Sequence, residues 1–357
     1  MSSGDVSVEK KGKRAGCLHW LGRVVLGTLI LLFVLMAVGA IYQAVASKRD
    51  AKTYQPVDQM VEVDGIQLRL DCRGKGSPTV VLEAGASVYS IAWVRIQNDV
   101  AKFTRVCSYD RAGMGWSDSV RGELSPHRVA GMLHVLLEKG GEQPPYLMVG
   151  HSLGGIYVRA FASLYPDDVV GMVLVDSSHE NQYLLLPPEF VKLNNTQSVA
   201  FQFCRVTAPF GLVRAIKMMD SLVVSFRLTE EEKEPLLAAM YRTGYCSAAA
   251  REMNMFFAYA SQPKDLNSLG DMPLVVLTSG SDAQEMYDSL PPAFQSQLTL
   301  EVMQRVVDTS NAMQEELAGL STRGKQIVVR ESGHNIQLDA PEVVIGAIQE
   351  VFEQVSK

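Results

Sequence analysis

The segment 146–155 constrains the fold of this chain more than any other stretch. Its apolar residues run directly into Gly-His-Ser-Leu-Gly, and a helix-like pattern follows. This arrangement is typical of a sharp turn between a buried strand and a helix, with strained backbone at its central residue. Gly150 and Gly154 keep side chains out of the space where strand and helix nearly touch. We expect the turn to project the Ser152 hydroxyl above the sheet and to leave the backbone N–H of Leu153 free to bind an oxyanion.

Length and composition favour a globular protein with one large core. The chain has 357 residues, of which 47% are hydrophobic and 20% are charged. Its net charge of -6 gives no reason to expect nucleic-acid binding. There is no glycine-rich nucleotide motif and no metal-binding spacing of cysteine and histidine, so we expect neither a cofactor nor a metal. The five cysteines are Cys17, Cys72, Cys107, Cys204 and Cys246.

The N-terminal part predicts a membrane anchor. Residues 1–23 are polar and basic, and residues 24–42 carry no charge. With the small residues that follow, a signal-anchor helix over 24–46 is long enough to cross a hydrocarbon layer of about 30 Å. Basic residues are more numerous before this helix than after it, which predicts a cytoplasmic N-terminus and an extracytoplasmic body. A cleaved signal peptide is the alternative, because Ala44-Val45-Ala46 has the form of a cleavage site.

After a polar tether at 47–58, strand patterns and helix patterns alternate. Repeated strand–helix units predict an α/β fold with a mostly parallel sheet and helices on both faces. The first two strands flank Asp64-Gly65, which indicates an antiparallel hairpin. The expected strands are 60–63, 66–70, 79–83, 105–109, 146–149, 172–175, 273–278 and 326–330, with helices near 126–139, 156–164, 296–318 and 341–354.

The strand pattern is missing between residues 179 and 270. This segment reads as several short helices and is far longer than an ordinary connection, so we expect a helical cap over the C-terminal edge of the sheet. The remaining segments, 59–178 and 271–357, then form the core domain. The many Met and Phe residues of the cap are more readily explained by its own packing than by substrate contact.

Three motifs together resemble the α/β-hydrolase family, from about residue 59 to the end of the chain. They are the segment around Ser152, the loop Tyr109-Asp110-Arg111-Ala112-Gly113-Met114-Gly115, and Ser332-Gly333-His334 after the last strand. The resemblance implies an eight-stranded, mostly parallel sheet with a helical cap and a site at its C-terminal edge, here preceded by one transmembrane helix. It also implies the chain order serine, acid, histidine, with Ser152 as nucleophile and His334 as base.

Two aspartates are candidates for the acid that orients the histidine. Asp282 follows the strand 273–278, which is the usual place in the family, although one residue closer to Gly280 than is common. Asp176 directly follows the strand 172–175, and some α/β hydrolases carry the acid there. We favour Asp176, and Asp282 stays open.

The resemblance also implies an oxyanion hole made by the backbone N–H groups of Leu153 and Ala86. Gly85 would let the backbone approach, although the loop reads Ala-Gly-Ala-Ser where many relatives have His-Gly. His151 belongs to the turn around Ser152 as a supporting residue, together with the flanking glycines. We expect Asp110 and Arg111 to brace the loops and to take no part in the reaction.

In the family's sheet the second and fourth strands are neighbours, which implies a Cys72–Cys107 disulfide. We also expect a Cys204–Cys246 disulfide within the cap, in keeping with an oxidising exterior. Ordinary buried thiols are the alternative, especially for the cap pair.

A serine nucleophile favours acyl transfer. Haloalkane dehalogenases and epoxide hydrolases of this fold use an aspartate at that position. The leading hypothesis is a membrane-tethered serine hydrolase that cleaves a small apolar acyl ester through an acyl-enzyme, as carboxylesterases and lipases do. The alternatives are an amidase or aminopeptidase, an acyltransferase or perhydrolase with the same triad, and a non-catalytic binding protein on this fold.

Overall fold

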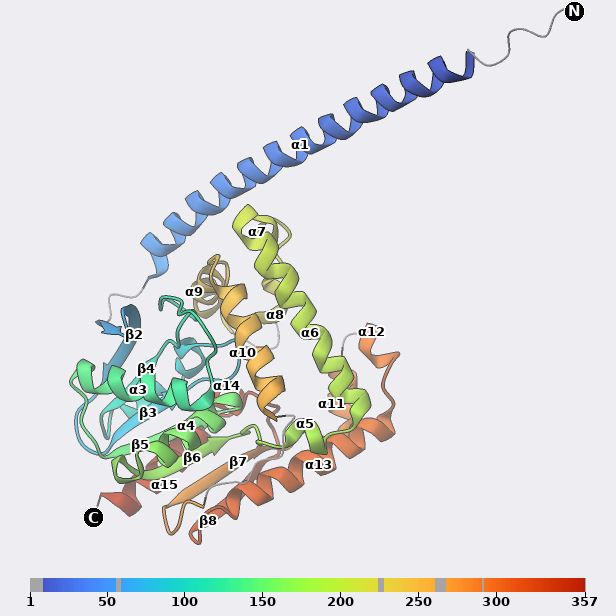
Figure 1. The fold of residues 1–357 in the computed structure, drawn as a ribbon. Helices are drawn as coiled ribbons and strands as arrows, with labels where there is room; N and C mark the ends of the chain where they lie inside the picture. The colour runs from blue at the N-terminus through green and yellow to red at the C-terminus, as the bar shows by residue number, and fades with distance from the viewer. Residues whose placement is uncertain (1–8, 56–58, 224–227, 261–267, 291, 357) are drawn as a thin grey trace, which may run out of the picture.

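The computed structural model describes residues 9–55, 59–223, 228–260, 268–290 and 292–356. Its centre is an eight-stranded sheet in the order β1-β2-β4-β3-β5-β6-β7-β8 (Figure 1). Strand β2 pairs antiparallel with β1 and β4, and all other neighbours are parallel. The strands are β1 (Gln59–Val63), β2 (Ile66–Arg73), β3 (Thr79–Glu83), β4 (Val106–Tyr109), β5 (Tyr146–His151), β6 (Val169–Val175), β7 (Leu274–Ser279) and β8 (Gly324–Val329).

Helices cover both faces of this sheet, which is why its central strands are apolar on both sides. Helices α3 (Pro126–Gly140), α4 (Leu153–Leu164) and α13 (Leu300–Ala318) share one apolar core with the sheet. Helices α2 (Gln97–Val100) and α15 (Pro341–Val355) pack in the core of the other face. Shorter elements are η1 (Ser90–Trp93), η2 (Pro166–Asp168), α11 (Ala283–Ser289), α12 (Pro292–Gln295) and α14 (Ile336–Asp339). The predicted α/β fold with an eight-stranded, mostly parallel sheet is confirmed.

Helix α13 begins later than the sequence pattern suggested. We expected a helix from about 296, whereas the structure starts it at Leu300. The Thr299 hydroxyl accepts a hydrogen bond from the backbone N–H of Val302 at 3.2 Å, and such a cap fixes the first turn.

The described residues between β6 and β7 form helices joined by loops, with no strand among them. We call α5 to α10 and η3 the cap helices; their bounds are α5 (Gln182–Leu185), α6 (Pro188–Thr207), η3 (Ala208–Phe210), α7 (Leu212–Ala215), α8 (Asp220–Val223), α9 (Glu230–Met240) and α10 (Tyr245–Ala260). Their own apolar core includes Met219, Met240 and Tyr245. A Cys204–Cys246 disulfide joins α6 to α10, and a Cys72–Cys107 disulfide joins β2 to β4. Both predicted disulfides are therefore present.

Helix α1 (Glu9–Tyr54) is a single helix of 46 residues that projects from the body of the protein (Figure 1). By length and composition it is the one described helix that is able to cross a membrane. It continues through most of the segment that we expected to be a tether. The reason is tertiary packing, since Ala51 and Tyr54 contact the apolar core of the cap helices. Residues 56–58 of that segment lie outside the described part of the chain.

Candidate functional site

Ser152 occupies the sharp turn between β5 and α4. Its φ of 51° and ψ of -122° lie in a region that side-chain-bearing residues rarely adopt, so the turn holds backbone strain. A Cβ on Gly150 would lie 2.7 Å from the carbonyl oxygen of Gly154, which explains why the chain has glycine there. The backbone N–H of Ser152 donates to Val175 O at 3.1 Å, and its carbonyl accepts from Ser178 N at 2.9 Å. The turn is thus tied to the end of β6.

Asp176 and His334 meet beside this turn. Oδ2 of Asp176 lies 2.6 Å from Nδ1 of His334, and Oδ1 accepts a hydrogen bond from the backbone N–H of Ser279 at 3.0 Å. Asp176 has a φ of 40°, a second strained residue at the end of a strand. Both carboxylate oxygens of Asp176 therefore have a partner, which fixes the orientation of the group toward the imidazole.

Asp282, the other candidate acid, has a different partner. It is the N-cap of α11, where its Oδ1 accepts from the backbone N–H of Glu285 at 2.8 Å. The Glu285 side chain in turn accepts from the backbone N–H of Asp282 at 3.3 Å, which completes a capping box. The structure therefore pairs Asp176, and not Asp282, with the histidine.

The protonation of His334 is governed by two opposing influences. Desolvation of the ring lowers the pKa of His334, but the hydrogen bond and the negative charge of Asp176 together raise it above its ordinary value. The side chain is 55% exposed, so desolvation is limited and we regard Asp176 as the dominant influence. Because Nδ1 of His334 is hydrogen-bonded to Asp176, Nε2 is the ring nitrogen that can exchange a proton with a reacting group.

His151, the residue before Ser152, supports the histidine loop. Its Nε2 lies 2.9 Å from the carbonyl oxygen of His334, and its ring centroid lies 4.7 Å from that of His334. The carbonyl can only accept, so Nε2 carries the proton, while Nδ1 lies 3.3 Å from the amide nitrogen of Gln337. Burial, and next the charge of His334, lower the pKa of His151 to about 3. A neutral imidazole thus links the serine turn to the histidine loop.

The loop after β3 lies against the serine turn. A Cβ on Gly85 would lie 2.8 Å from Nδ1 of His151 and 3.3 Å from Cβ of Ser152, so only glycine allows this approach. The carbonyl oxygen of Gly85 accepts from Nη2 of Arg111 at 2.6 Å. In a trans peptide the C=O and the following N–H point in opposite directions. The N–H of Ala86 therefore points away from Arg111.

A buried cluster of charged side chains holds the loop after β3 in place. Arg111 bonds to Glu83 at 2.7 Å and to Glu252 at 2.8 Å, and all three side chains are buried. Arg111 also donates to the carbonyl oxygen of Ala84 at 2.7 Å, as a loop-bracing residue would. Burial raises the pKa of Glu83, although the charge of Arg111 opposes this. The second oxygen of Glu252 accepts from the backbone N–H of Ser87 at 2.5 Å.

Sequence reasoning missed both carboxylates of this cluster. Glu83 gave one signal, an acidic residue that ends an otherwise apolar strand, where a charge needs a partner. Glu252 gave none, because it lies on α10 and reaches the loop only through the tertiary fold. Through Glu252, a cap helix contacts the loop that lies against Ser152.

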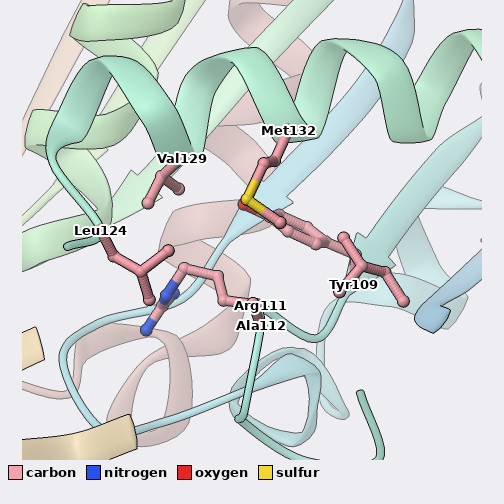
Figure 2. A pocket seen from close by; sticks show the side chains of 7 residues that line it. Tyr109, Arg111, Ala112, Leu124, Val129 and Met132 are labelled. Carbon is pink, nitrogen blue, oxygen red and sulfur yellow. The ribbon is translucent and has the colours of Figure 1, made fainter. Parts of the chain in front are cut away.

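Two other places in the protein resemble binding sites. Cys72, Cys107 and Glu142 lie close enough together to suggest a metal, but the two cysteines form a disulfide and have no thiolate to offer. A small pocket lies between Arg111 and α3, lined by Leu124, Val129 and Met132 among others (Figure 2). Ser152, Asp176 and His334 are not among its lining residues, so the pocket is separate from the group described above.

Comparisons with known proteins agree with this architecture. A model described as "Alpha/beta hydrolase family" matches residues 80–347. The chain is 24% identical over 267 residues to protein YbdG of Bacillus subtilis, covering 73% of this chain and 80% of that protein. It is 36% identical over 124 residues to an uncharacterized vacuolar membrane protein of Saccharomyces cerevisiae, covering 32% of this chain and 19% of that protein.

Two solved structures have the same fold. A thermophilic esterase from Thermogutta terrifontis has a TM-score of 0.59 and 20% identity, covering 85% of this chain and 100% of the esterase. The epoxide hydrolase CorEH has a TM-score of 0.61 and 16% identity, covering 83% of this chain and 98% of the hydrolase. At such identities the likeness concerns the fold, and the chemistry rests on the residues of this chain.

Proposed function

The chain belongs to the alpha/beta hydrolase family, and on that basis we propose that it is a serine hydrolase that cleaves carboxylic esters through an acyl-enzyme. The observation that carries this proposal is the Asp176–His334 pair, 2.6 Å apart, beside a strained serine turn. A serine there supports acyl transfer over epoxide opening, which in this fold uses an aspartate nucleophile. We favour uncharged apolar esters as substrates, because the cap helices are rich in apolar residues and their flexible methionines suit varied acyl chains.

In the proposed reaction His334 takes the proton of the Ser152 hydroxyl on Nε2 as Oγ attacks the ester carbonyl carbon. Asp176 holds the ring and stabilises the imidazolium. The N–H groups of Leu153 and Ala86 stabilise the oxyanion of the tetrahedral intermediate. The intermediate collapses, the alcohol leaves with the proton from Nε2, and the acyl group stays on Ser152. Water then gives a proton to Nε2 of His334 as its oxygen attacks the acyl carbon. The second tetrahedral intermediate collapses, the acid is released, and His334 returns the proton to Oγ of Ser152.

We further propose that α1 anchors this domain in a membrane, with the N-terminus cytoplasmic and the site outside. Residues 24–42 are uncharged, and the described side chains along this part of α1 are mostly exposed, as expected of a helix made to face lipid. The disulfides support an oxidising compartment for the body. The name of the yeast relative, a vacuolar membrane protein, agrees with membrane residence.

A substrate series tests the ester proposal. The full chain in detergent micelles is assayed with p-nitrophenyl esters from two to sixteen carbons, with an aryl amide and with an aromatic epoxide, beside Ser152→Ala. We expect ester hydrolysis that Ser152→Ala abolishes and no diol from the epoxide. Diol formation that survives in Ser152→Ala would contradict the proposal. Product analysis with added alcohol separates hydrolysis from transfer of the acyl group to an acceptor other than water.

A further inference from the structure

Helix α1 does not simply tether the body, because its C-terminal third is packed against the cap helices. The backbone of Gly39 lies so close to Phe210 of η3 that a Cβ would clash with the Phe210 carbonyl. Four residues later, the Gln43 side chain donates to the carbonyl oxygen of Tyr241 at 2.6 Å. Seven residues further on, after about two helical turns, the buried Asp50 accepts from Arg214 at 2.6 Å. The direction of α1 relative to the cap helices is therefore fixed.

These contacts place the cap helices at a definite depth. Gly39 is part of the apolar run 24–42, which is followed by the polar Gln43, and it precedes the end of that run by three residues. With a rise of about 1.5 Å per residue, the contact with Phe210 lies about 4.5 Å inside that end. If α1 spans the membrane, η3 is at the boundary between headgroups and acyl chains.

The surface that continues from η3 is apolar and exposed. On α6, Val199, Phe203 and Val206 are spaced by four and three residues, so they lie on one side of the helix. Cys204, which is buried in the cap core, lies on the other side. We call this surface the α6 face; it consists of Val199, Phe203, Val206, Phe210, Leu212 and Ile216, all of them exposed.

The orientation of α6 suits a membrane surface. In Figure 1, α6 begins far from α1, ends beside it next to α7, and runs crosswise to it. The other cap helices and the sheet lie on the side of α6 away from the projecting part of α1 (Figure 1). A helix that lies crosswise to a membrane anchor and turns an apolar side toward the bilayer has the geometry of an interfacial helix.

We propose that the α6 face dips into the outer leaflet, so that the cap helices rest on the membrane beside the anchor. The occupant of this face is lipid, because the face continues directly from a helix that is itself apolar and exposed. Interfacial helices bury their apolar side by about 5–10 Å, in line with the depth of η3. The proposal rests on the membrane anchoring proposed above.

This placement bears on substrate supply. Helix α10 is joined to α6 by the Cys204–Cys246 disulfide, and its Glu252 touches the loop beside Ser152. A cap held at the lipid surface brings the site to the layer in which apolar acyl esters concentrate. The substrate class that fits is an amphiphilic acyl lipid, presented from the leaflet and not from bulk water.

Single-cysteine labelling of the full chain in lipid vesicles tests the proposal. Cys17 lies outside the two disulfides, so Cys17→Ser gives a background for labelling with an environment-sensitive fluorophore. Three exposed valines are replaced singly: Val206→Cys on the α6 face, Val34→Cys in the anchor and Val328→Cys on β8, exposed by 63%, 48% and 51%. The measurement is the loss of emission when the vesicles contain nitroxide-labelled lipids, in one series with the nitroxide near the top of the acyl chain, for position 206, and in a second series with it near the end of the chain, for position 34, which lies near the bilayer centre. Position 328 is measured in both series.

We expect strong quenching at positions 34 and 206 and none at 328. Quenching at 34 without quenching at 206 would contradict the insertion of the α6 face into the leaflet but would leave the anchor proposal standing. No quenching at 34 would overturn the anchor, and with it this proposal. A blue shift at 206 without quenching would mean that protein, such as a second copy of the chain, covers the face, and would equally overturn it.

Discussion

Oδ2 of Asp176 lies 2.6 Å from Nδ1 of His334, although the two residues are 158 positions apart and follow strands that are not neighbours. Strand β7 lies between β6 and β8, and its last residue helps to build the pair. The Ser279 N–H donates to Asp176, and the Ser279 hydroxyl donates to the carbonyl oxygen of Ser332 at 3.1 Å. The acid and the loop of the base are thus held by the same residue.

The pairing predicts unequal effects for two isosteric substitutions. Asp176→Asn should lower kcat by about 10³- to 10⁴-fold, because the amide cannot stabilise the imidazolium and favours the wrong tautomer. Asp282→Asn should leave kcat unchanged and the fold intact, because asparagine caps a helix about as well as aspartate. Steady-state ester hydrolysis by both variants checks this. The reverse order of effects would assign the acid to Asp282.

The raised pKa of His334 predicts the acid side of the pH profile. The imidazole must be neutral to accept the serine proton, so kcat/KM should rise with pH through a pKa above 6.5. In Asp176→Asn both raising influences are gone, and the midpoint should move to lower pH. The pH dependence of the rate of fluorophosphonate labelling measures both midpoints. An unchanged midpoint in Asp176→Asn would contradict the account.

The lowered pKa of His151 predicts a loss of stability in acid. Between pH 6.5 and about 3 the unfolded chain binds a proton at this residue that the folded protein does not, so stability falls as pH falls. At pH 5 the cost is about 2 kcal/mol. Urea unfolding should therefore show that the free energy of unfolding falls less between pH 7 and pH 5 in His151→Gln than in the wild type. Equal losses would show that His151 titrates normally.

Glu252 should act on catalysis through the loop beside Ser152. Glu252→Gln leaves Arg111 with one carboxylate and loosens the loop, so kcat should fall about 10- to 100-fold with little change in KM. Glu230→Gln, on the same set of cap helices but with a side chain 79% exposed, is the matched control and should behave as wild type. A rise in KM alone would indicate a role in substrate binding.

Much of the sheet could be predicted from the sequence because its strands are continuous apolar runs between turn signals. Strands β3 and β5 are buried at every residue, and such runs differ clearly from amphipathic helices. The serine turn could be predicted because Gly150 and Gly154 meet a local steric need. Information of this kind lies within a few consecutive residues.

What could not be predicted depends on contacts between distant residues. The sequence favoured Asp176 but left Asp282 open, because each aspartate comes after a strand. Only the fold shows that Asp282 caps a helix while Asp176 faces a histidine. The docking of α1 depends on Gln43 reaching Tyr241. Neither residue carries a local signal of this contact, and the same holds for Glu252 and Ser87.

The most direct test of the central claim is fluorophosphonate labelling of the folded full chain beside Ser152→Ala and His334→Ala. The account predicts that the wild type is labelled, that Ser152→Ala is not, and that His334→Ala is labelled far more slowly, because the serine has lost its base. Mass analysis of the labelled protein should find the phosphonyl group on Ser152. A correctly folded wild type that does not react, or a label that persists in Ser152→Ala, would contradict the claim that Ser152 is an activated nucleophile.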